Sequence, residues 1–174
     1  MKILDVEFLK DRFDYDPETG KLFWKEINQI NTNLRRSQFA GKEAGYEYQG
    51  YIYVRIGKSN YLSHRICYAI YNEEFPKGII DHIDGNKKNN KIENLRVCTP
   101  AENAKNAKRY LTNKSGITGV RWDKKDNAWR VQIGSNDGKV QKSFHDFFEA
   151  CCFRKSMELK LEYSLNHGTD REGK

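Results

Sequence analysis

The residues best suited to chemistry are an acid and a histidine side by side, Asp81 and His82. A loop rich in Asn and Gly follows and leads to Asn94. Next comes Thr99-Pro-Ala-Glu102, where Thr at the N-cap, Pro at the first helical position and Glu two residues later are typical of a helix start, with Asn103 in the first turn. Carboxylate and amide oxygens are ligands that Mg²⁺ or Mn²⁺ prefers. A neutral imidazole can take a proton from water. The pattern therefore predicts one divalent metal ion beside a base that activates water.

This combination resembles the ββα-metal site of HNH nucleases, and most of all that of the phage-type HNH homing endonucleases. The resemblance is carried by the following residues: Asp81-His82, Asp84-Gly-Asn86, Asn89-Asn90, Asn94-Leu-Arg96 and Asn103. It implies that His82 is the general base, that Asn94 braces the loop and His82, and that Asp81 and Asn103 are the metal ligands. All four positions keep the family pattern.

Other polar residues near this motif have two interpretations. Asn86, Asn89 and Asn90 are interpreted as turn residues, because Asn side chains cap turns and tolerate left-handed backbone. His64, which begins a predicted helix after a strand, either contacts the site or packs beneath it. Asn106, one turn beyond the predicted metal ligand on the last helix, is a further candidate contact. Two arginines are candidates for contact with a phosphate: Arg65 and Arg96.

The elements around the motif indicate an α+β protein. Apolar residues at helical spacing predict a short helix over 3–13. A strand is predicted over 21–25, and the segments 51–56 and 61–63 form a hairpin. A helix over 64–71 follows. We expect this small α+β layer to support the site and to touch DNA.

The layer leads into the ββα-metal core. Strands are predicted over 79–81 and 95–98, joined by the loop 83–94. The helix that starts at Pro100 is expected to run to about Tyr110.

The last third of the chain has a different pattern. Two strands are expected within 117–133, a third over 139–144 and an amphipathic helix over about 147–163. Three strands and a helix resemble the AP2 DNA-binding domain, through the following segments: Ser115-Gly-Ile-Thr-Gly-Val-Arg-Trp122, Trp129-Arg-Val-Gln-Ile133 and Lys142-Ser-Phe144. The resemblance implies a sheet that reads bases in the major groove.

Positive charge is concentrated in this region. The whole chain has a net charge of +7, and residues 104–142 alone hold 10 Lys+Arg against 3 Asp+Glu. Such a block is typical of a surface that binds nucleic acid, although a solvated basic face is the alternative. Nine residues are predicted to contact DNA: Arg121, Trp122, Lys125, Arg130, Gln132 and Lys142 in the sheet, with Lys105, Lys108 and Arg109 before it. In the second strand, Trp129, Val131 and Ile133 should pack on the helix.

The composition, 37% hydrophobic and 32% charged, fits a globular protein. No segment approaches the roughly 18 apolar residues of a membrane span, and the N-terminal residues show no secretion signal. We therefore expect the cytoplasm, that of the host cell for a phage-encoded protein, and a monomer whose partner is double-stranded DNA. None of the four cysteines forms a Cys-x-x-Cys pair, so no structural zinc is expected.

Together these features predict a nuclease domain over 1–110 with its core at 61–110, a linker at 111–115, an AP2-like domain at 116–165 and a tail at 166–174. The predicted function is a site-specific DNA endonuclease of homing type. Two alternatives stay open: an AP2-like regulator without catalysis, and a non-specific or restriction-type HNH nuclease.

Overall fold

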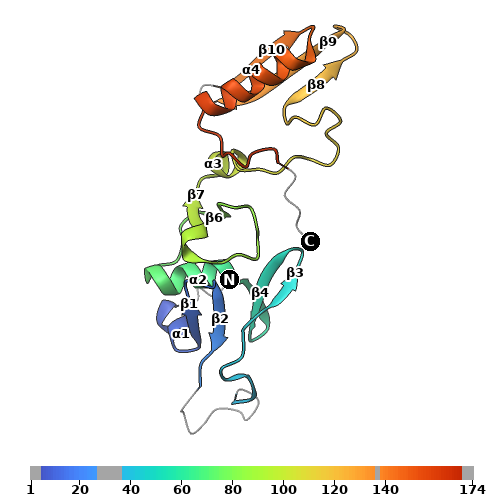
Figure 1. The fold of residues 1–174 in the computed structure, drawn as a ribbon. Helices are drawn as coiled ribbons and strands as arrows, with labels where there is room; N and C mark the ends of the chain where they lie inside the picture. The colour runs from blue at the N-terminus through green and yellow to red at the C-terminus, as the bar shows by residue number, and fades with distance from the viewer. Residues whose placement is uncertain (1–4, 27–36, 136–137, 170–174) are drawn as a thin grey trace. The chain divides into compact units, whose positions relative to one another are not determined.

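The chain forms two compact units in the computed structural model, which describes residues 5–26, 37–135 and 138–169. The first unit extends to Pro100 and the second begins at Ala101 (Figure 1). This change of unit comes earlier in the chain than the expected linker at 111–115.

The first unit is an α+β arrangement of small antiparallel sheets around one central helix, as expected. Its elements in chain order are α1 (Val6–Lys10), β1 (Phe13–Asp16), β2 (Lys21–Trp24), η1 (Ser37–Phe39), β3 (Tyr46–Tyr48), β4 (Tyr51–Ile56), β5 (Ser59–Leu62), α2 (Ser63–Asn72), β6 (Ile79–His82), η2 (Ile92–Asn94) and β7 (Leu95–Cys98). The sheets are β1-β2, β3-β4-β5 and β6-β7.

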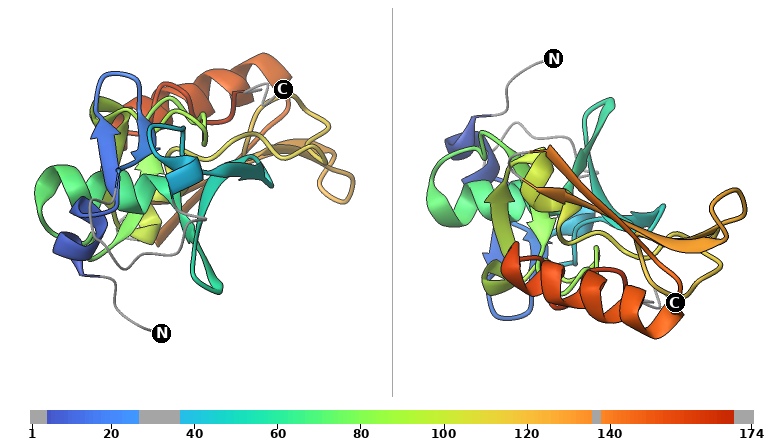
Figure 2. Two further views of the ribbon diagram at one scale, coloured as in Figure 1. Left: turned by 90° about the horizontal axis from the view of Figure 1, so that it is seen from below. Right: turned by 90° about the horizontal axis from the view of Figure 1, so that it is seen from above.

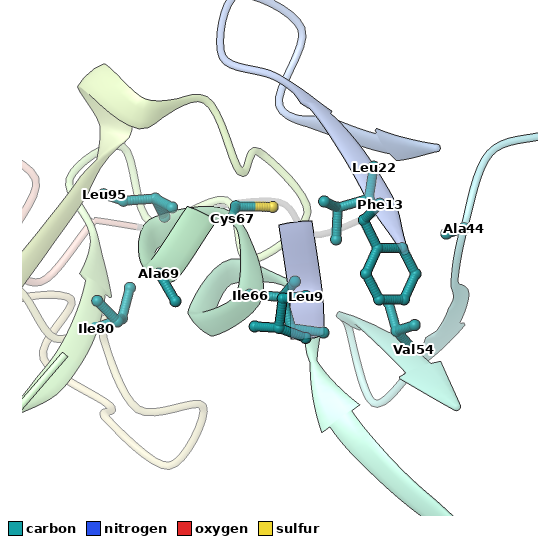
Figure 3. Packing of buried hydrophobic residues seen from close by; sticks show 10 residues of the cluster. All are labelled: Leu9, Phe13, Leu22, Ala44, Val54, Ile66, Cys67, Ala69, Ile80 and Leu95. Atoms are coloured by element: carbon teal, nitrogen blue, oxygen red, sulfur yellow. The ribbon is translucent and has the colours of Figure 1, made fainter. Parts of the chain in front are cut away.

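Helix α2 provides one side of the hydrophobic core. Its Ile66 and Cys67 are at most 1% exposed and pack with Leu9 of α1, Phe13 of β1 and Val54 of β4, as the close view of the cluster shows (Figure 3). Ile80 of β6 and Leu95 of β7 belong to the same cluster. The core thus joins α1, β1, β4 and α2 directly to β6 and β7, the two strands that carry the candidate site motif.

The predicted helix over 3–13 is wrong at its C-terminal end. Helix α1 ends at Lys10, and Phe13 opens β1, where it pairs with Trp24. The pairing partner lies across the turn that contains Gly20, so spacing within 3–13 cannot reveal it. Strand β3 was also missed, because it has only three residues and all three are exposed.

Helix α3 (Pro100–Ala104) starts where the Thr-Pro signal predicts but stops well before Tyr110. The carbonyl of Lys105 accepts a hydrogen bond from the Ser164 N–H at 3.1 Å, and that of Ala107 accepts one from Gly168 at 2.9 Å. These carbonyls would serve the helix if it continued. Hydrogen bonds from residues 164 and 168 therefore take the place of the backbone hydrogen bonds that would continue the helix.

The second unit is a three-stranded antiparallel sheet with one helix along it (Figures 1 and 2). Besides α3, which belongs to this unit from Ala101 on, its elements are β8 (Val120–Asp123), β9 (Ala128–Ser135), β10 (Gly138–Phe144) and α4 (Phe147–Lys160). Val120, Val131 and Ala150 form the core, with Trp129 and Phe153 packed against it. The three strands and the packing of Val131 are as predicted. The helix ends at Lys160 rather than at about residue 163, and its buried residues are Ala150, Arg154 and Glu158, so the prediction of an amphipathic helix is wrong.

A buried charge fixes α4 on this sheet. Arg154 is 3% exposed; its Nε donates to Glu158 at 2.8 Å and its Nη1 donates to the carbonyl of Gln132 at 2.7 Å. Because an unpaired buried charge is costly, these bonds define how the helix lies on β9.

Within the described part of the chain, no helix has the length and apolar character required to cross a membrane. The four cysteines are free thiols, and Cys67 and Cys98 are buried.

Candidate active site

Strands β6 and β7 present the motif at one end of a two-stranded ladder. Their register pairs Asp81 with Arg96 and His82 with Leu95. The hairpin continues into its loop through a hydrogen bond from the Ile83 N–H to the carbonyl of Asn94 at 2.9 Å. The histidine therefore stands at the end of regular structure, where the backbone holds it firmly.

The His82 ring is 4% exposed and lies among polar and aromatic side chains. Its Nε2 is 3.0 Å from Oδ1 of Asn90. The ring of His64 meets it edge-on at 5.0 Å, and the Tyr51 ring lies 6.3 Å away. His64 thus contacts His82, the candidate base, from the start of α2.

Both imidazoles are uncharged at neutral pH. Burial lowers the pKa of His82 below its usual value, although the Asn90 hydrogen bond and the carboxylates of Asp84 and Asp81 oppose this effect. Burial, helped by His82 and Arg65, lowers the pKa of His64 to about 3. A neutral His82 can accept a proton, as a general base must.

Asn94 is hydrogen-bonded across the loop between β6 and β7. Its Nδ2 donates to Oδ1 of Asp84 at 2.9 Å and to the carbonyl of Asn89 at 2.8 Å, and its Oδ1 accepts from the Asp84 N–H at 2.9 Å. Asn89 also donates to Asp84 at 2.7 Å. The loop between β6 and β7 is thereby closed around the Asp84 carboxylate.

Asp81 is held by an arginine. Arg96 donates from Nε and Nη2 to Oδ2 of Asp81, at 3.0 and 2.8 Å. The Asp81 side chain is 9% exposed and that of Arg96 is 41% exposed. Arg65, in contrast, donates to the carbonyls of Gly78 and Pro76, so its guanidinium ties down the turn before β6.

The donor set fits a hard cation in its chemistry. Asp81 has a carboxylate at the end of β6, and Asn103 of α3 has an amide oxygen; because Asn103 belongs to the second unit, its role as a metal ligand stays a prediction from the motif. No cluster of three or more His, Cys, Asp and Glu side chains with metal-binding geometry occurs among the residues that the structure describes. Asn106 is 4% exposed in the second unit.

Two residues of the site were not singled out by sequence. Asn90 was interpreted as a turn residue, yet its side chain faces His82. Tyr51 contacts both histidine rings, and Nζ of Lys87 lies 4.3 Å from the centre of the Tyr51 ring. The sequence could not show whether Asn89 or Asn90 faces His82, because tertiary packing decides which of two adjacent amides turns inward.

In the second unit, the register places the predicted DNA contacts on two faces. The face away from α4 carries Arg121 and Arg130, which are paired across β8 and β9, with Gln132 beside them. From β10 it also carries residues that sequence reasoning did not select: Lys139, Gln141 and Ser143. Arg130 forms ion pairs with Asp126 and, at 3.3 Å, with Asp123.

Two of the predicted contacts lie on the other face. Trp122 pairs with Trp129, and their rings are 5.2 Å apart, so Trp122 does not share the face of Arg121. Lys142 pairs with Val131, and its Nζ lies 5.2 Å from the centre of the Phe153 ring on α4. Side chains alternate between the two faces of a strand, and the pairing between strands decides which residues share a face. The observed pairing places Trp122 and Lys142 on the face opposite to the predicted one.

The remaining basic candidates precede the sheet. Lys105 donates to the carbonyl of Leu161 at 2.9 Å and is partly buried. Lys108 and Lys125 are exposed, and Arg109 is half-buried.

A family model described as HNH endonuclease matches residues 61–105, from β5 to just beyond α3. Protein 3.8 of Escherichia phage T7 is 35% identical over 96 residues, which cover 53% of this chain and 79% of that protein. The chain belongs to the HNH endonuclease family, nucleases that act on DNA phosphodiester bonds.

Two further relatives are similar over part of the chain. One is the SPbeta prophage-derived protein YosQ of Bacillus subtilis (strain 168), named as an HNH homing endonuclease, which is 45% identical over 64 residues. The other is the Uncharacterized HNH endonuclease L560 of Acanthamoeba polyphaga mimivirus, 36% identical over 92 residues. The matches cover 36% and 47% of this chain, and 37% and 46% of these two relatives. No solved structure matches the chain.

Proposed function

We propose that the protein is a site-specific DNA endonuclease of homing type, in which residues 116–165 form an AP2-like DNA-binding domain. The observation that carries the catalytic part is the buried, uncharged His82 at the end of β6, directly beside the Asp81 carboxylate. The resemblance of the motif and the homing name of one relative support the rest.

In this proposal His82 takes the proton from the attacking water. Asp81 and Asn103 would hold one divalent ion, Mg²⁺ or Mn²⁺, which when bound stabilises charge on the scissile phosphate and the leaving oxygen. Asn94 keeps the loop closed, so that the base does not move during attack. Arg96, which contacts Asp81 and is 41% exposed, is positioned to contact a phosphate as well.

The hairpin β3–β4 offers a surface for the DNA strand next to this base. Its register places Tyr46 opposite Tyr53 and Tyr48 opposite Tyr51, so the four rings share one face. Tyr46 and Tyr48 are 44% and 56% exposed. Aromatic rings stack on unpaired bases with little sequence preference. Since Tyr51 also contacts His64 and His82, a DNA strand bound on this face would lie next to His82, the proposed general base.

Recognition of sequence is assigned to the outer face of the second sheet. Arg121 is exposed there, and Arg and Gln are the side chains that most often read base edges in the major groove. To reach a base, Arg130 must exchange its ion pairs with Asp123 and Asp126 for contacts to DNA. Binding at this face should therefore depend on salt.

The decisive experiment incubates the protein with supercoiled plasmid in EDTA and in Mg²⁺. We expect cleavage only with the ion, and the product distinguishes nicked from linear DNA. Asp81→Ala should abolish cleavage and keep DNA binding. His82→Ala should slow it by roughly 10²–10⁴, the usual effect of losing a general base. His145→Ala, a change at an exposed histidine of the second unit, is the control and should cleave normally.

The two alternatives give different results in the same assay. A regulator without catalysis would leave the plasmid supercoiled in Mg²⁺. A non-specific nuclease would cut every plasmid at many positions, and Arg121→Ala would not change its pattern. If EDTA-treated protein cleaves DNA, the metal assignment is wrong.

The tyrosine surface has its own test. Tyr48→Ala should raise KM for cleavage several-fold with little change in kcat, because the ring binds the strand but takes no part in proton transfer. Tyr71→Ala is a matched control, since Tyr71 is 54% exposed on α2. Equal effects of the two changes would remove the tyrosine face from the proposal.

A further inference from the structure

Asn90 makes a direct contact with the candidate base. The residue is 3% exposed, and its side-chain Oδ1 lies 3.0 Å from Nε2 of His82. An amide oxygen can only accept a hydrogen bond, so the partner nitrogen of a neutral imidazole must carry the proton. The other ring nitrogen, Nδ1, is then the one with a lone pair. The contact thus selects one of two tautomers, and a base works only in the tautomer whose unprotonated nitrogen faces the water.

The main chain of Asn90 is held from the opposite side by the hairpin β1–β2. The hydroxyl of Tyr15 donates to the carbonyl of Asn90 at 2.7 Å, across 75 residues of sequence. Burial raises the pKa of Tyr15, which keeps this hydroxyl protonated as a donor. The Ile92 N–H donates to the carbonyl of Pro17 at 3.3 Å. Two hydrogen bonds therefore join the hairpin to the catalytic loop.

A glycine allows this close approach. Gly20, at the turn of the hairpin, has φ +75°, and a Cβ there would lie 2.4 Å from the backbone N of Lys91 and 2.6 Å from the carbonyl carbon of Asn90. Because both are backbone atoms, the loop would have to move to admit any side chain. The hairpin thus fits against residues 90–91 with no space between them.

We propose that Asn90 is a positioning residue that fixes His82 in its Nε2-protonated tautomer, and that the hairpin β1–β2 is the support that holds Asn90 in place. The hairpin lies outside the segment 61–105 that matches the HNH family model, so the support is supplied by a separate part of the chain. The inference rests on the proposed role of His82 as the base. It also explains why the His82 ring is already oriented before DNA binds.

The test uses Asn90→Ala and Asn90→Asp in the full-length protein, with Asn86→Ala as control. Asn86 lies in the same loop, is exposed and contacts the Lys88 N–H. Asn90→Ala should lower kcat by ~10–100-fold, as is usual for the partner of a functional histidine, while KM stays within about a factor of two. Asn90→Asp keeps an oxygen acceptor and should recover most of the rate.

A spectroscopic readout separates positioning from mere stability. Long-range ¹H–¹⁵N correlation at neutral pH reports which ring nitrogen of His82 carries the proton. We expect Nε2–H in the wild type and in Asn90→Asp, and a mixture of tautomers in Asn90→Ala. The inference is overturned if Asn90→Ala keeps kcat within about twofold of wild type, or if its His82 tautomer is unchanged.

The support is tested separately. Tyr15→Phe removes only the hydroxyl that contacts Asn90 and should shift the tautomer and kcat in the same direction by a smaller factor. Tyr61→Phe, at a half-buried tyrosine packed against the same core, is the control. If Tyr15→Phe behaves as Tyr61→Phe does, the hairpin is not the support. Should His82→Ala cleave normally, the base assignment fails, and the tautomer spectrum still decides what Asn90 does to the ring.

Discussion

Replacing Asn94 with Ala should open the loop between β6 and β7, with a cost that follows from three hydrogen bonds. The side chain is 7% exposed; it donates to Asp84 and to the Asn89 carbonyl and accepts from the Asp84 N–H, all at 2.8–2.9 Å. A neutral hydrogen bond contributes about 1 kcal/mol and one to a charged group about 1.5–3 kcal/mol. Since Asp84 keeps its bonds from Asn89 and from the Asn86 N–H, we expect the low end of the sum, ~3 kcal/mol.

Urea and thermal unfolding measure this loss. For a unit of roughly 100 residues, 1 kcal/mol lowers Tm by about 4–8 °C, so Asn94→Ala should lower it by roughly 12–24 °C. Asn86→Ala, in the same loop but exposed, should cost less than about 1 kcal/mol. Equal losses for the two variants, or a loss below about 1 kcal/mol for Asn94→Ala, would refute the reasoning that the amide closes the loop.

The Asp84 carboxylate gives a second readout of the same change. Partial burial raises the pKa of Asp84, yet hydrogen bonds from Asn89, the Asn86 N–H and Asn94 outweigh burial and hold the pKa below its ordinary 3.8. Its contribution to stability is therefore present above about pH 3.8 and is lost as the pH falls through the lower folded-state pKa. In Asn94→Ala this pKa should rise, which carbon-detected NMR titration would show.

Three further predictions concern other parts of the molecule. Burial lowers the pKa of His64 to about 3, so the folded state keeps it neutral while the unfolded chain takes a proton below about pH 6.5; stability should fall by up to about 1.4 kcal/mol per pH unit from 6.5 toward 3, and urea unfolding of His64→Gln should lack this slope. The cleavage rate should decline on the acid side with a midpoint below pH 6.5, because burial lowers the pKa of His82; a midpoint above 7 in the pH–rate profile would contradict that cause. Gly119→Ala should lower the free energy of unfolding by at least ~1–3 kcal/mol, since its φ is +76° and a Cβ would lie 2.4 Å from the carbonyl O of Gln132 and 2.6 Å from the guanidinium of Arg154; a wild-type Tm would show that the second unit adjusts freely.

Much of the architecture could be predicted because local signals carry it. Alternation predicted β4 at its observed bounds, Tyr51–Ile56. The Thr-Pro signal predicted the first residue of α3, since its cap needs only neighbouring residues. The end of α3 could not be predicted, because the carbonyls of Lys105 and Ala107 pair with residues 164–168 instead of continuing the helix.

The sequence by itself determined the identities and the order of the reacting groups. Adjacent Asp81 and His82 at the end of a strand, followed by an Asn-rich loop, specify a family motif whatever surrounds them, because strand and loop geometry are short-range. The sequence also determined that three strands and a helix would follow in the last third of the chain, since the spacing of apolar residues differs between strands and helices.

Only the tertiary structure decided which side chains meet. It turned Asn90 toward His82, brought His64 edge-on to the same ring and joined Arg96 to Asp81. It also placed Trp122 on the side of Trp129 rather than of Arg121. Each of these contacts depends on packing between segments far apart in the chain or on the register between strands. Such contacts are set by the whole core, and no local pattern of residues encodes them.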